Sequence, residues 1–104
     1  MTPSAVPNFD QFLEVLDSDF QVEFIRHKSI EVRLVEVRKL SKDEESLVQF
    51  SLIFQSGQSD QYFTQATVNL DHQVLGSFHL FLVPIGLGKA GFMQYEAIIS
   101  RTAD

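Results

Sequence analysis

The chain has 104 residues, with 14 acidic against 8 basic side chains, a formal charge of −6 and no Cys. This length is typical of one domain, and the absence of Cys excludes disulfides and thiolate metal sites. Binding to a phosphate backbone needs clustered Lys and Arg, and no such cluster is visible. We therefore expect no nucleic-acid partner.

The N-terminus reads MTPSAVPNFDQF, without the basic and apolar segments of a secretion signal. No run approaches the roughly 18 apolar residues that span a bilayer. We expect a soluble cytoplasmic protein with no membrane association. Residues 1–7 hold two of the three prolines and are expected to form a flexible lead-in to a single domain over residues 8–104.

An amphipathic helix is predicted at the start of this domain. Asn8 is a candidate cap, and Gln11 three residues later completes a capping-box pattern. Four apolar residues then follow at i, i+3, i+4 and i+7, the period of one helix face: Phe9, Phe12, Leu13 and Leu16. The polar run 17–19 ends the pattern.

From Phe20 onward the apolar residues alternate with a period of two, which is typical of strands. The pattern predicts strands at about 20–25, 30–38, 47–54, 62–70, 75–85 and 92–101. The intervening segments, including the charged loop 41–46, are too short for parallel crossovers. We therefore expect a mainly β fold, an antiparallel meander of about six strands curled into a small barrel or roll, with the helix plugging an open side. The alternation slips at Leu34-Val35, which predicts a β-bulge there.

No motif in the sequence indicates a phosphate or metal site. The glycine-rich segment 86–91 lacks the first glycine and the Ser/Thr of a phosphate-binding loop, so a hairpin loop is expected. His27, His72 and His79 lack the close spacing that puts two ligands on one metal ion. We expect no cofactor.

A catalytic trio can be written from Asp71, His72 and Ser77, but no nucleophile elbow accompanies it. Asp71-His72 is more typical of a turn, where Asp side chains bond to their own backbone. The acidic run 43–45 is typical of a solvated loop. These patterns do not predict an enzyme.

The strand at 75–85 is apolar on both faces in its second half. Phe78, Leu80 and Leu82 line one face, and Phe81, Val83 and Ile85 line the other. A solvated outer face would be polar, so either the N-terminal helix or another protein chain should cover it. The residues of this candidate interface are Phe81, Val83, Ile85 and Phe63.

Four segments carry a resemblance to a known family: Phe50-Ser51-Leu52-Ile53-Phe54, Leu75-Gly76, Phe81-Leu82-Val83-Pro84 and Tyr95-Glu96-Ala97. In these segments the chain resembles a small bacterial family of uncharacterised domains. The resemblance implies a β-rich fold with no established activity. By analogy it also implies an accessory or structural role beside phage-tail-like proteins.

Our leading functional expectation is a non-enzymatic interaction or assembly module that associates with a protein partner or with itself. The alternatives are a small barrel that holds an apolar ligand among its ten Phe side chains and an enzyme of unknown type.

Overall fold

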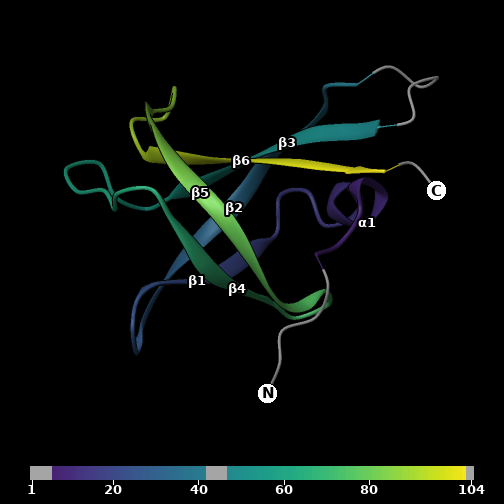
Figure 1. Cartoon of the computed structure of the whole chain (residues 1–104). Helices are drawn as coiled ribbons and strands as arrows, with labels where there is room; N and C mark the ends of the chain where they lie inside the picture. The colour runs from purple at the N-terminus through teal and green to yellow at the C-terminus, as the bar shows by residue number, and fades with distance from the viewer. Residues whose placement is uncertain (1–5, 42–46, 103–104) are drawn as a thin grey trace.

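The computed structural model describes residues 6–41 and 47–102 and confirms a mainly β fold of six antiparallel strands with one N-terminal helix (Figure 1). The elements are α1 (Phe9–Glu14), β1 (Asp19–Ile25), β2 (Lys28–Lys39), β3 (Leu47–Ser56), β4 (Ala66–His72), β5 (Gly76–Leu87) and β6 (Met93–Thr102). The first five residues of the expected lead-in, most of the expected loop 41–46 and the acidic run 43–45 lie outside the described residues.

The strands close into a barrel in the order β1-β2-β3-β6-β5-β4. This order corrects the continuous meander, which would have paired β3 with β4 and β6 with β1. The barrel instead joins two three-stranded meanders, β1–β3 and β4–β6, through the pairs β3·β6 and β1·β4. Residues 57–65 form a connection long enough to carry the chain from β3 to β4, which are not neighbours in the barrel. Tight turns instead force the strands that they join to pair with each other.

The inward-facing residues of the strands and Phe12 of α1 form one core. Its largest fully buried side chains are Tyr95, Phe12, Phe20, Phe50, Phe54, Phe78, Leu34, Leu52, Leu70, Leu82, Val22 and Val32. Burying each large apolar side chain contributes roughly 1.5–3 kcal/mol. The β2–β3 register shifts between Leu34 and Glu36, which confirms the predicted bulge. A second bulge lies between Pro84 and Gly86 of β5, where Gly86 has φ +107°.

The helix plugs one end of the barrel. β5 pairs with β6 from Val83 onward only, and its first half pairs with β4 alone. The ring of Phe12 fills the space at this end, with its centroid 5.7 Å from that of Phe78 on β5 and 6.1 Å from that of Phe50 on β3. Among the described residues no helix is long and apolar enough to cross a membrane.

Several expected boundaries shift. The capping box at Asn8 and Gln11 is present, but α1 ends at Glu14 rather than near Leu16. Val15 caps the helix and Asp17 has φ 68°, so the chain turns away toward β1 and leaves Leu16 exposed. Val6 and Pro7, assigned to the lead-in, contact the domain instead.

The fourth strand also differs from its prediction. It begins at Ala66 rather than Tyr62, because residues 62–65 belong to the connection that crosses the barrel end. Its last residue is His72, so Asp71-His72, expected in a turn, belongs to the strand, and the turn lies at 73–75. Hydrophobic alternation cannot separate a strand from an extended loop that packs one aromatic side chain.

Candidate functional site

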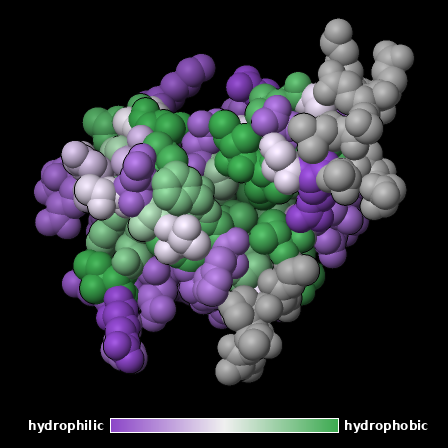
Figure 2. Space-filling model, viewed as in Figure 1, coloured by the Kyte–Doolittle hydropathy of each residue, from purple (hydrophilic) through white to green (hydrophobic). Residues whose placement is uncertain are grey.

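The outer side of β5 carries three of the four residues of the candidate interface. Phe81 is 51% exposed and Ile85 is 47% exposed, while Val83 between them is half-buried. Ile85 lies in the second bulge, where β5 carries one residue more than β6. Figure 2 shows hydrophobic side chains over β5, the strand that crosses the front of Figure 1.

β6 extends this surface with a residue that the sequence analysis missed. Ile98 is 57% exposed, two residues beyond Glu96, which pairs with Val83. The signal was present in the sequence: Ile98 and Ile99 are adjacent, and adjacent strand residues face opposite sides. We define the outer β5 face by these side chains: His79, Phe81, Val83, Ile85, Glu96 and Ile98.

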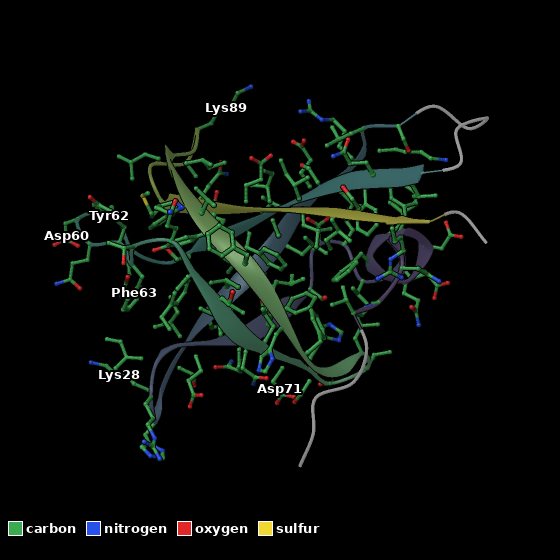
Figure 3. All side chains as sticks on the ribbon, in the orientation of Figure 1. Lys28, Asp60, Tyr62, Phe63, Asp71 and Lys89 are labelled. Carbon is green, nitrogen blue, oxygen red and sulfur yellow. The ribbon has the colours of Figure 1, made fainter. Side chains whose placement is uncertain are left out.

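Phe63 does not belong to the outer β5 face. Its ring stacks on that of Phe24, with centroids 4.5 Å apart and planes 5° apart. Its backbone N–H donates to the hydroxyl of Tyr95 at 2.9 Å. Figure 3 shows Phe63 on the connection that precedes β4. Phe63 secures this connection to the core and so lies apart from the other three residues of the candidate interface.

The helix does not cover the outer β5 face. Phe12 contacts Phe78, whose side chain faces into the barrel, and Phe9 lies 5.6 Å from Phe50 between ring centroids. Phe81 and Ile85 remain exposed. Coverage by α1, the first of the two alternatives, is therefore wrong. A short helix at the barrel end reaches the inward residues of the strands rather than their outer side.

The three residues of the possible catalytic trio are not brought together. The hydroxyl of Ser77 donates to the carboxylate of Asp71 at 2.8 Å on the exposed side of the strands. His72, the residue after Asp71, is buried and faces the barrel interior, where its ring lies 4.4 Å from that of Phe20. Neighbouring strand residues point to opposite faces, so adjacency in sequence separates these two side chains.

His72 contacts a different serine. Its Nδ1 accepts from the backbone N–H groups of Val74 at 3.0 Å and Leu75 at 3.2 Å. Nδ1 therefore carries no proton, and the proton of the neutral ring lies on Nε2, which donates to the Ser18 hydroxyl at 2.8 Å. The Ser18 hydroxyl in turn donates to the carbonyl oxygen of Val15 at 2.5 Å.

This direction of the hydrogen bonds opposes nucleophilic catalysis. A catalytic base would need an unprotonated Nε2 to take the serine proton, whereas this Nε2 is the donor. Burial lowers the pKa of His72, against an opposing contribution from Asp71. The pair therefore joins the end of α1 to the β4–β5 turn.

A cleft lies beside this pair, between the end of α1 and the β4–β5 turn. We call it the helix cleft; its volume is about 410 Å³. Its lining residues are Glu14, Val15, Leu16, Ser18, Asp19, His72, Gln73 and Val74. Across residues 6–41 and 47–102, no group of three or more His, Cys, Asp or Glu side chains is placed to hold a metal ion.

The family described as a domain of unknown function, DUF6916, matches residues 7–99. The chain belongs to this family. The match runs from just before α1 into β6, so it covers the helix and all six strands except the last three residues of β6. This confirms the resemblance to an uncharacterised family of small domains. No curated protein and no solved structure matches the chain.

Proposed function

We propose that this DUF6916 domain is a non-enzymatic assembly module that associates with a second copy of itself through the outer β5 face. The observation that carries the proposal is the exposure of Phe81 and Ile85 on the outer side of β5, with Ile98 exposed on β6 just beyond the last β5–β6 pair. Contiguous exposed apolar side chains mark interaction surfaces on soluble proteins. Aromatic residues at the centre of such patches contribute most of the binding energy.

The polar side chains on this face favour a second copy as the partner. A two-fold interface brings the same patch of both subunits together, so the patch must complement itself. Along β5, His79 lies two residues before Phe81, and Glu96 pairs with Val83 two residues after it. A two-fold axis at Phe81 would bring the ring of His79 opposite the carboxylate of Glu96 in the other copy.

The interior of the barrel counts against the apolar-ligand alternative. The ring centroid of Phe20 lies 5.3 Å from that of Phe54 and 6.4 Å from that of Phe78, in edge-to-face contacts. These rings fill the space that an apolar ligand would occupy. The donor role of the His72 Nε2 counts against a serine-histidine enzyme. An accessory structural role in the cytoplasm, as expected from the sequence, fits a self-assembling module.

The test is sedimentation of wild type and Phe81→Glu over a range of protein concentrations. We expect wild type to associate and Phe81→Glu to weaken the association about tenfold or more, because the substitution buries a charge at the centre of the contact. Tyr62→Glu is the matched control, since Tyr62 is an exposed aromatic residue of the 57–65 connection. It should associate as wild type does.

A monomeric wild type at every concentration would overturn the proposal. Equal effects of Phe81→Glu and Tyr62→Glu would also overturn it. The loss of association would then come from the added negative charge and not from the position of Phe81 on the outer β5 face. Circular dichroism of each variant checks that the barrel remains folded.

A further inference from the structure

The β1–β2 hairpin ends in an exposed, positively charged tip. Arg26 and Lys28 make no ion pair with the described part of the chain, and Ile25 beside them is 51% exposed. Ile25 pairs with Lys28, so Arg26 and His27 form a two-residue turn in which His27 has φ 65°. Glu23 accepts from the backbone N–H of His27 at 3.1 Å. Figure 3 shows Lys28 at this tip, pointing away from the barrel.

The helix cleft presents one acidic side chain without an ion pair to the described residues, together with exposed apolar side chains. Leu16 and Val74 contribute exposed apolar surface, and Val74 is 72% exposed. Glu14 makes no ion pair with the described residues, while Asp19 is paired with Arg33 at 3.2 Å. Acidic residues beside apolar ones fit a protein segment in which a basic side chain accompanies an aliphatic one.

The two surfaces lie at opposite ends of β1. The cleft includes Asp19 at the start of the strand, and the tip follows Ile25 at its end. Seven residues in extended conformation separate them by about 20 Å. Figure 1 shows the β1–β2 hairpin and α1 on opposite sides of the barrel. The tip of a folded chain therefore cannot enter its own cleft.

We infer that the helix cleft binds the β1–β2 hairpin tip of a second copy of this chain, in a head-to-tail contact distinct from the outer β5 face. Lys28 and Arg26 lie against Glu14, and Ile25 packs on Leu16 and Val74. Two cations are too few to hold a phosphate backbone, and the apolar residues on both sides indicate a protein contact. Because the two surfaces differ, a pair of copies joined by this contact still has one free hairpin tip and one free helix cleft. Further copies can therefore add, and the contact propagates into rings or filaments.

Charge reversal in the Phe81→Glu background tests this contact independently of the proposed function. At about 0.05 M salt we expect residual association that weakens at about 0.5 M, where screening shortens the reach of these charges. Lys28→Glu should weaken this association about tenfold or more. Lys89→Glu, the same charge change at the tip of the β5–β6 hairpin, is the matched control and should have no effect.

Mixing the two reversed chains distinguishes this contact from a general charge effect. In the Phe81→Glu background, the chain with Lys28→Glu and the chain with Glu14→Lys should each be monomeric when kept apart, because each substitution brings like charges together. An equimolar mixture should associate again, since the reversed tip of one chain matches the reversed cleft of the other. A carbodiimide cross-link between Lys28 and Glu14 in an equimolar mixture of isotopically labelled and unlabelled copies would locate the contact, because only a link between copies gives cross-linked peptides with one labelled and one unlabelled part.

Absence of salt-dependent association in Phe81→Glu would overturn the inference and leave the proposed function untouched. Equal losses from Lys28→Glu and Lys89→Glu, or a mixture that stays monomeric, would overturn it as well. Weaker association of Phe81→Glu than of wild type, together with residual association that salt weakens further, would support both contacts.

Discussion

The ring of His72 joins the β4–β5 turn to the segment that follows α1. Its Nδ1 accepts from two backbone N–H groups, and its Nε2 donates to Ser18. A proton added to Nδ1 would turn this acceptor into a donor facing two donors, in a site already desolvated. Burial is the main cause of the lowered pKa, and Asp71 opposes it.

This arrangement predicts a loss of stability in mild acid. The unfolded chain takes up the proton of His72 near pH 6.5, its usual pKa, whereas the folded chain does so at lower pH. The contribution of His72 to the free energy of unfolding is therefore fully present above about pH 6.5. It is lost as the pH falls toward the pKa of His72 in the folded chain, by at most about 1.4 kcal/mol per pH unit. Urea unfolding at a series of pH values from 7.5 to 4.5, in steps of about half a unit, measures this slope.

His72→Gln supplies the comparison, because its side-chain amide does not titrate. Its stability should change less with pH over this window than that of wild type. His27→Gln removes an exposed histidine that lies outside the outer β5 face and should keep the wild-type slope. Parallel curves for wild type and His72→Gln would contradict this role of His72.

Tyr95 predicts a second effect at this scale. Its hydroxyl accepts from the backbone N–H of Phe63 at 2.9 Å, and burial raises its pKa, so it stays protonated at neutral pH. Tyr95→Phe leaves that N–H without its partner and should lower the free energy of unfolding by about 1–2 kcal/mol. Tyr62→Phe, at an exposed tyrosine, should change it by less than about 0.5 kcal/mol. Equal values from chemical denaturation would argue against the hydrogen bond.

At the scale of elements, the packing of one side chain, Phe12, stabilises α1 more than the hydrogen bonds of the helix itself do. Six residues are too few for a helix to be stable by itself. Phe12 is fully buried between Phe50 and Phe78, whereas Leu13 next to it is exposed. The helix therefore depends on packing at the barrel end.

Phe12→Ala should lower the free energy of unfolding by about 3–5 kcal/mol, the usual cost of removing a buried Phe. Leu13→Ala should cost less than about 1 kcal/mol because its side chain already contacts water. Denaturant unfolding of the two variants makes the comparison. Hydrogen exchange should show faster exchange of the α1 amides in Phe12→Ala. Similar stabilities for both variants would mean that the helix is not a plug.

The elements also show what periodicity can predict. The capping box at Asn8 and the bulge near Val35 follow from local patterns and were predicted correctly. The end of α1 was not, because Leu16 continues the apolar spacing although the chain has already turned. The same limit applies to Tyr62, which keeps the alternation of β4 while lying outside it. Periodicity reports the spacing of apolar residues, and packing decides which of them are buried.

For the whole molecule, the two contacts proposed above predict the size of a fully disrupted variant. Phe81→Glu combined with Lys28→Glu should be a monomer with a radius of gyration near the 13.6 Å of the Cα trace. Small-angle X-ray scattering over a concentration series measures it. A larger radius that grows with concentration would reveal a contact outside both surfaces, and a larger constant radius would indicate a looser barrel.

The sequence by itself determined the number and type of the elements and most of the core. These follow from local spacing: Phe20 and Val22 alternate, Phe9 and Phe12 recur at helical intervals, and short loops force antiparallel neighbours. It also located Phe81, Val83 and Ile85 as an apolar outer surface, because an apolar run on both faces of a strand is visible without coordinates.

Only the tertiary structure decided which strands pair, what α1 covers and which residues face His72. The pairs β3·β6 and β1·β4 depend on the path that residues 57–65 take from β3 to β4. The apolar alternation within a strand does not reveal this path, because it is the same whichever strand lies beside it. Ser18 and His72 lie 54 positions apart, so their hydrogen bond leaves no local pattern. Local spacing encodes which face of an element is apolar, whereas closure of the barrel decides which of those faces remain exposed.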